Sequence, residues 1–131
     1  MPPAAKAAPR KALHILVVDD NLDQVHSLAF LLSHAGHAVD YAVNATVAMD
    51  LAERLQPDVI VLDVALPDGS GLSLAGELRR MPGLENTYLI AITGTEVAAE
   101  EALAAGFHKF LRKPVSYSSV EEILATLLAD E

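Results

Sequence analysis

Five short apolar segments that alternate with five helix-like segments constrain the fold of this chain more than any other feature. The first apolar segment, HILVV, is rich in β-branched residues and is typical of a strand that is covered on both faces. The segments expected to be strands are 14–18, 37–42, 58–63, 87–93 and 107–111. The expected helices cover about 22–35, 45–55, 72–80, 96–105 and 118–129. This alternation indicates a parallel sheet, because parallel neighbours need a crossover and the crossover helix covers the sheet.

Chain length then selects one parallel architecture. With 131 residues, the chain suits a single domain with an open sheet better than a closed barrel of eight strands and about twice the length. We therefore expect an α/β fold with a five-stranded parallel sheet, doubly wound (βα)5, in the flavodoxin-like strand order 2-1-3-4-5. Residues 1–12 have no hydrophobic periodicity and are expected to form a flexible leader, and 13–131 the folded domain.

The net charge of the chain and its lack of cysteine argue against several classes of function. A net charge of −9 disfavours direct binding to nucleic acid or to a membrane, since both carry negative charge. Because the chain has no cysteine, it has no disulfide, thiolate metal site or cysteine nucleophile. No apolar run reaches the roughly 20 residues that span a bilayer, and the first residues contain no signal segment. We therefore expect a cytoplasmic protein.

Acidic residues stand at the carboxyl ends of the first and third predicted strands. Asp19 and Asp20 follow the first strand, and Asp63 ends the third. These strands are neighbours in the expected order, so the three carboxylates should converge at the edge where open α/β sheets bind ligands. Like charges at short distance repel unless a cation intervenes, and Mg²⁺ (or Mn²⁺) prefers such oxygen ligands. The sequence therefore predicts a divalent metal site.

Two further polar residues reach the same edge, Thr93 after the fourth strand and Lys113 after the fifth. Mg²⁺ and the Lys113 ammonium together balance the three carboxylates, which allows one of them to approach an electron-rich phosphorus atom. Phosphoryl transfer to an aspartate is a known form of covalent catalysis and depends mainly on positioning and charge neutralisation. We predict that Asp63 is the nucleophile and that Thr93 and Lys113 contact the phosphoryl group.

The motifs at these strand ends are similar to those of a known family. They are ILVVDDN (15–21), VLDVALPDGSG (61–71), AITG (91–94) and FLRKP (110–114). Over about residues 14–128 the chain resembles the receiver domains of two-component response regulators. The resemblance implies that Asp63 takes a phosphoryl group from a histidine kinase or a histidine phosphotransfer protein and relays the signal to a downstream protein target.

The resemblance also assigns roles to the remaining site residues. Asp19 and Asp20 resemble the acidic pair that holds Mg²⁺ with Asp63, and Ala65 matches the residue whose backbone carbonyl binds the metal. The family switch is a threonine that moves toward the phosphoryl group while an aromatic residue on the fifth strand turns inward. Thr93 and Phe110 occupy these two positions. In this family the peptide bond that follows the residue matched by Lys113, here Lys113–Pro114, is expected to be cis.

Other functions remain open on the same residues. A Mg²⁺-dependent phosphotransferase or phosphatase of the haloacid dehalogenase type also uses an aspartate nucleophile, but Ala65 stands where its second aspartate belongs. A flavin or nucleotide binder would need a phosphate-binding loop where Asp19 and Asp20 stand. A degenerate receiver that acts only as a binding module would lack a chemical residue, and all are present. We expect a signalling protein rather than an enzyme, with at most a weak homodimer through its final helix.

Residues outside the acidic cluster are expected to have simpler roles. Asp68, in the loop PDGSG, is expected to be a turn residue rather than a metal ligand. The five histidines show no metal-site spacing. Among the histidines, His26 is the one most expected to have a functional role. It lies beside Phe30 on the first helix, and related receivers dock their phosphodonor partly on that helix. Met1 and the absence of an effector domain favour a stand-alone regulator over a fragment of a hybrid kinase.

Overall fold

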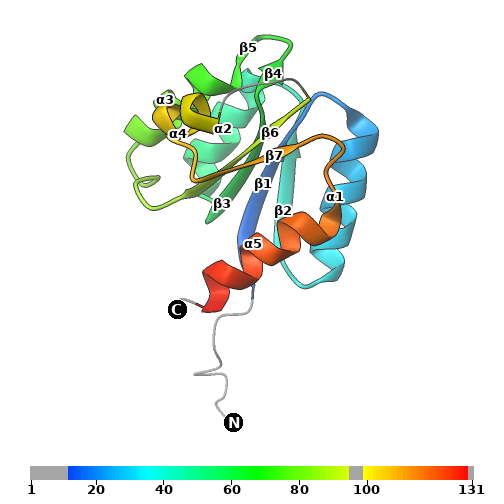
Figure 1. Cartoon of the computed structure of the whole chain (residues 1–131). Helices are drawn as coiled ribbons and strands as arrows, with labels where there is room; N and C mark the ends of the chain where they lie inside the picture. The colour runs from blue at the N-terminus through cyan, green and yellow to red at the C-terminus, as the bar shows by residue number, and fades with distance from the viewer. Residues whose placement is uncertain (1–11, 95–98, 130–131) are drawn as a thin grey trace.

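The computed structural model describes residues 12–94 and 99–129, and these contain the predicted parallel sheet (Figure 1). Its strands are β1 His14–Val18, β2 Ala38–Ala42, β3 Val59–Asp63, β6 Tyr88–Thr93 and β7 Lys109–Arg112. They pair in parallel in the order β2-β1-β3-β6-β7, which is the order 2-1-3-4-5 of the main strands. The α/β fold and its strand order are therefore confirmed.

Helices follow the strands as predicted, with ends that differ by at most one residue where they are described. They are α1 Leu22–His34, α2 Ala45–Leu55, α3 Gly71–Arg80, α4 Ala99–Ala105 and α5 Tyr117–Ala129. The predicted start of the fourth helix near Glu96 lies outside the described residues, as does the expected leader apart from Ala12. None of the helices within 12–94 and 99–129 has the length and apolar character needed to cross a bilayer.

Local sequence signals explain where the helices begin and end. The first turns of α1, α2 and α3 each donate a backbone N–H to a side chain at the N-cap, which is Asn21, Asn44 and Ser70 respectively. Gly36, just beyond α1, has φ +106°, a left-handed conformation that glycine adopts without steric cost. The chain then turns directly into β2.

Helices cover both faces of the sheet (Figure 1). Two hydrophobic layers, one on each face, hold them against it. Leu16 and Ile60 face α2, α3 and α4, whereas Val17 and Val61 face α1 and α5, because successive side chains of a strand point to opposite faces. All four are fully buried, and each such side chain contributes about 1.5–3 kcal/mol. A shift of one residue in strand pairing would exchange the two layers, so this pattern also specifies the position of the strand ends.

A small hairpin follows β3 and was expected only as a loop. Its strands, β4 Ala65–Leu66 and β5 Gly69–Ser70, pair in antiparallel fashion directly before α3. Two-residue strands carry no hydrophobic periodicity that a sequence pattern can reveal.

Candidate functional site

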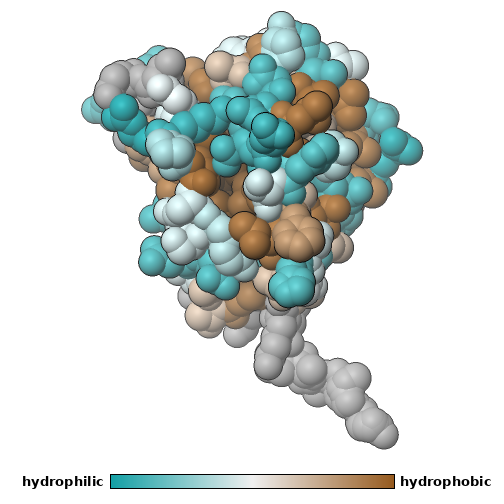
Figure 2. Space-filling model, turned by 90° about the vertical axis from the view of Figure 1, so that its right-hand side faces the viewer, coloured by the Kyte–Doolittle hydropathy of each residue, from teal (hydrophilic) through white to brown (hydrophobic). Residues whose placement is uncertain are grey.

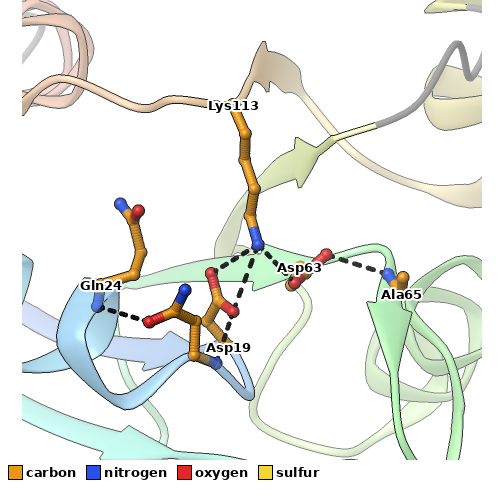
Figure 3. Close-up of polar contacts among 6 residues, drawn as sticks. Asp19, Gln24, Asp63, Ala65 and Lys113 are labelled. Atoms are coloured by element: carbon orange, nitrogen blue, oxygen red, sulfur yellow. Dashed lines mark hydrogen bonds and ion pairs between the residues drawn. The ribbon is translucent and has the colours of Figure 1, made fainter.

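Three charged side chains at the carboxyl ends of β1, β3 and β7 meet at one edge of the sheet (Figure 3). The Nζ atom of Lys113 lies 2.9 Å from Oδ2 of Asp63 and 3.2 Å from Oδ2 of Asp19. Both aspartates are buried, with 1% of Asp19 and 3% of Asp63 exposed. An ammonium group between two buried carboxylates offsets part of their mutual repulsion.

Backbone hydrogen bonds just beyond the strands position these side chains. The N–H of Asp19 donates to the carbonyl of Ala42 at 3.1 Å, and the N–H of Lys113 donates to the carbonyl of Thr93 at 2.8 Å. Each strand is thereby continued by one residue, which is the residue that carries the charge. The Lys113–Pro114 bond is cis, as the resemblance implies.

The carboxylates of Asp19 and Asp63 are also held by the backbone, a feature that the sequence analysis did not anticipate. Oδ1 of Asp19 accepts from the N–H of Asn21 at 3.0 Å, and Oδ1 of Asp63 accepts from the N–H of Ala65 at 2.9 Å. Both contacts join an aspartate to the amide two residues later, the local pattern of an Asx turn. An aspartate directly after a strand and before a loop was the available signal. One oxygen of each carboxylate is thus oriented locally.

Burial and charge act together on the ionisation of this cluster. Burial raises the pKa of Asp19, the Asn21 N–H opposes this, the charge of Asp63 raises it further, and Lys113 lowers it. For Lys113, burial alone would lower the pKa, but the hydrogen bond and charge of Asp63, with the charge of Asp19, raise it overall. The lysine is therefore cationic at neutral pH, whereas the charged form of Asp19 is disfavoured.

Asp20 completes a donor set that fits a divalent cation. One carboxylate oxygen each from Asp19, Asp20 and Asp63 lies within 4.8 Å of the others, and Asp20 is exposed. Oδ2 of Asp19 is buried and accepts no hydrogen bond from the described residues. Three carboxylates and the Lys113 ammonium leave two excess negative charges, and hard oxygen ligands are those that Mg²⁺ prefers. These aspartates can therefore hold a divalent ion.

The histidines lie apart from this cluster. In the part of the chain that the structure describes, the three aspartates form the one group of three or more His, Cys, Asp or Glu side chains close enough to share a metal. His14 instead contacts Asp40 at 2.9 Å, and His26 contacts Tyr41 at 3.2 Å.

Thr93 and Phe110 lie on the face of the sheet that α2, α3 and α4 cover. Thr93 ends β6 in alternation with Leu89 and Ala91, which face α2, α3 and α4, and it is 2% exposed. Phe110 is opposite Ala91 in the pairing of β6 with β7, and its half-buried ring packs against the same hydrophobic layer. The two residues expected to form a switch therefore share one face, beside the acidic cluster.

A close backbone approach holds the segment after Asp63 in place. The N–H of Gly71 donates to the carbonyl of Val64 at 2.6 Å. A Cβ atom at position 71 would lie 2.5 Å from the backbone oxygen of Asp63, closer than side chains tolerate. Gly71 is thus required where the start of α3 crosses the end of β3, a role that the sequence analysis did not assign.

Comparisons with known proteins agree with this arrangement. Residues 15–125 match the family described as the response regulator receiver domain. Response regulator MprA of Mycobacterium sp. (strain KMS) is 34% identical over 119 residues, which cover 89% of this chain and 50% of MprA. The aerobic respiration control sensor protein ArcB of Escherichia coli (strain K12) is 30% identical over 118 residues, 88% of this chain and 15% of ArcB. The chain spans half or less of these relatives.

Solved structures show the same fold. A response regulator receiver domain from Methylobacillus flagellatus superimposes with a TM-score of 0.79 at 30% identity, covering 86% of this chain and 96% of that domain. A putative response regulator from Chloroflexus aurantiacus gives a TM-score of 0.81 at 25% identity, covering 91% of this chain and 99% of the other. With its sheet order, its acidic edge and these matches, the chain belongs to the family of response regulator receiver domains.

Proposed function

We propose that Asp63 is a phosphoacceptor in a receiver domain that comprises residues 13–131. The observation that carries this proposal is the buried Asp63 carboxylate, 2.9 Å from the Lys113 ammonium and grouped with Asp19 and Asp20. Asp19, Asp20, Asp63 and the backbone carbonyl of Ala65 would hold Mg²⁺. When bound, the ion neutralises carboxylate and phosphoryl oxygens, so that an anionic nucleophile can approach phosphorus.

In the proposed reaction, a carboxylate oxygen of Asp63 attacks the phosphorus of a phosphohistidine. The new O–P bond forms as the P–N bond breaks, and the electron pair leaves with the imidazole nitrogen. The ring carries a proton on its other nitrogen, so it departs as a neutral imidazole. Lys113, already paired with Asp63, contacts the transferred group, and the Thr93 hydroxyl donates to one of its oxygens. The domain contributes positioning and charge neutralisation to this transfer, and we propose that it acts as a signalling module rather than an enzyme.

Phosphorylation is proposed to act on the downstream target through Thr93 and Phe110. Only a phosphoryl group that binds one conformer better than the other shifts a population, and a hydrogen bond from Thr93 provides this difference. The common face of these residues and the half-buried Phe110 ring support such a movement. Phe110 lines a cavity together with Leu103, His108 and Lys109, and this surface is proposed to bind the target.

The proposed phosphodonor is a histidine kinase or a histidine phosphotransfer protein in the cytoplasm. Receiver domains interact with proteins of these classes. On α1, Leu22, Phe30 and Leu31 are 53%, 67% and 40% exposed, and Figure 2 shows hydrophobic patches on the side of the molecule that α1 covers. This surface, with His26 held against Tyr41, is proposed to dock the donor.

Intact mass spectrometry tests the phosphoacceptor. The whole chain incubated with acetyl phosphate and Mg²⁺ should gain the mass of one phosphoryl group, and Asp63→Asn should gain none. Lys113→Met is expected to react more slowly because it removes the cation beside Asp63. An unmodified wild-type chain, or an adduct that persists in Asp63→Asn, would contradict the proposal.

NMR spectroscopy tests the switch separately. Beryllofluoride, which mimics the phosphoryl group on aspartate, should change the resonances of the Phe110 ring in the wild type. In Thr93→Ala the same mimic should leave the ring largely unchanged, because the hydrogen bond that favours the active conformer is missing. Equal ring shifts in both proteins would argue against Thr93 as the coupling residue.

A further inference from the structure

The hairpin β4–β5 carries Ala65 but has little packing of its own. Ala65, Pro67, Asp68 and the two residues of β5 are exposed, and Leu66 is the member that packs against the hydrophobic layer. Hairpins of this length are at best marginally stable in isolation. Contacts with other elements must therefore hold the hairpin in one position.

The base of the hairpin is fixed to β3. The hydrogen bond from Gly71 to Val64 closes it at 2.6 Å, and the backbone of Asp63 leaves no space for a side chain at Gly71. The end of the hairpin next to Asp63 is therefore anchored by close backbone contacts.

The tip of the hairpin is fixed to α2 by one side chain. Oδ1 of Asp68 accepts from the N–H of Ala45 at 2.7 Å, and Oδ2 accepts from the N–H of Thr46 at 3.0 Å and from its hydroxyl at 2.8 Å. Backbone N–H groups in the first turn of a helix lack partners within the helix and attract a carboxylate. These bonds, first the one from Ala45, lower the pKa of Asp68, so it is ionised at neutral pH.

A second side chain caps the same helix through a hydrogen bond within α2 itself. Oδ1 of Asn44 accepts from the N–H of Val47 at 2.8 Å. Asn44 and Asp68 thus satisfy different donors of one helix end, but Asp68 also hydrogen-bonds that end to the segment after Asp63. This difference separates helix capping from any effect on the site.

We propose that Asp68 is a positioning residue for the metal site: its tether to α2 holds the backbone carbonyl of Ala65 at the acidic cluster. Ala65 lies between the two anchors, Gly71 at the base and Asp68 at the tip, and its N–H donates to Asp63. Releasing the tip leaves Ala65 fixed on one side, so its carbonyl samples positions away from the ion. The inference rests on the proposed function, in which this carbonyl binds the metal.

Matched variants of the whole chain test the tether. Asp68→Ala and Asn44→Ala each remove one cap of α2 and should lower the thermal midpoint of the metal-free protein by similar amounts. Binding of Mn²⁺, followed by the electron paramagnetic resonance of the free ion, should differ between them. Asp68→Ala is expected to weaken Mn²⁺ binding by about tenfold, as loss of an outer-shell partner does. Asn44→Ala should bind Mn²⁺ like the wild type.

A conservative variant adds an intermediate case to the test. Asp68→Asn retains one oxygen acceptor for the α2 amides and should lie between wild type and Asp68→Ala in Mn²⁺ affinity, with little loss of stability. Unchanged affinity in Asp68→Ala and Asp68→Asn, or an equal loss in Asn44→Ala, overturns the inference while the phosphoacceptor proposal stands. A wild-type chain that binds no Mn²⁺ overturns the metal site itself and this inference with it.

Discussion

At the carboxyl edge of the sheet, three carboxylates gather beside one ammonium group, whereas at the amino edge single polar side chains pair with backbone groups of neighbouring segments. Oδ2 of Asp58 accepts from the N–H of His14 at 2.8 Å. Nδ1 of His37 accepts from the N–H of Leu13 at 3.0 Å, and Nδ1 of His108 from the N–H of Leu89 at 3.1 Å. By contrast, Oδ2 of Asp19 at the carboxyl edge accepts no hydrogen bond from the described residues.

Arg79 at the end of α3 is the main connector of the amino edge. Its guanidinium donates to the carbonyls of Gly106, Leu84, Glu85 and Thr87, at 2.7 to 3.4 Å. It also lies 3.1 Å from Nδ1 of His108, whose ring stacks on Tyr88. The turns that lead into β6 and β7 are therefore tied to α3.

The contrast indicates that the two edges of the sheet have different roles, one in binding and one in stability. Charges that repel one another destabilise the apo protein but prepare a site for a cation and a phosphoryl group, while the satisfied edge supplies stability. If this is correct, substitutions at the two edges should change stability in opposite directions.

The largest expected effect on stability belongs to Arg79→Met. It leaves several backbone carbonyls without their charged donor, so the free energy of unfolding in urea should fall by about 2–3 kcal/mol. Mn²⁺ affinity should not change, because Arg79 is at the opposite edge from the acidic cluster. Arg80→Met, at the exposed neighbouring position, is the control and should be nearly neutral. A loss of metal binding in Arg79→Met would break the proposed separation of the edges.

A smaller effect of opposite sign is expected for Asp19→Asn. Removing one buried charge from the cluster should raise the free energy of unfolding of the metal-free protein by about 1 kcal/mol. The same change should abolish Mn²⁺ binding, measured by the signal of the free ion. Asp23→Asn, which removes an exposed acidic charge from the first turn of α1, should do neither. Destabilisation by Asp19→Asn would mean that its carboxylate contributes to the fold.

The smallest expected effect is the pH dependence of stability that His37 and His108 contribute at the amino edge. Burial lowers the pKa of His37, against the opposing charge of Glu121, and burial with the charge of Arg79 lowers the pKa of His108. The unfolded chain, with histidine near 6.5, then binds more protons than the folded one. The stability that these neutral rings contribute is therefore complete above about pH 6.5 and declines as the pH falls toward their lowered folded pKa values.

Asparagine substitutions isolate this contribution. His37→Asn and His108→Asn keep an acceptor near the Nδ1 position but cannot be protonated, so urea midpoints measured between about pH 7.5 and 5 should fall less steeply than in the wild type. His34→Asn, on the exposed side of α1, should retain the wild-type slope. Identical slopes for all of these proteins would show that the His37 and His108 rings do not couple folding to pH.

Much of the site could be predicted from the sequence, because its residues stand at the ends of the predicted strands. Asp19, Asp63 and Lys113 stand where apolar runs stop, and the parallel order brings those ends together. What escaped prediction were contacts made across loops. Asp68 was expected only to form a turn, yet it caps α2, and the hairpin around it has strands too short for a periodic pattern.

The sequence by itself determined the order of strands and helices and the edge to which the acidic residues belong. These depend on the alternation of side chains and on capping residues, which act over a few neighbouring positions. Only the tertiary structure decided that Lys113 pairs with Asp63, 50 residues away, and that Asp68 reaches Ala45 across 23 residues. Such contacts arise when packed layers bring separate segments within hydrogen-bonding distance, and no local pattern encodes that distance.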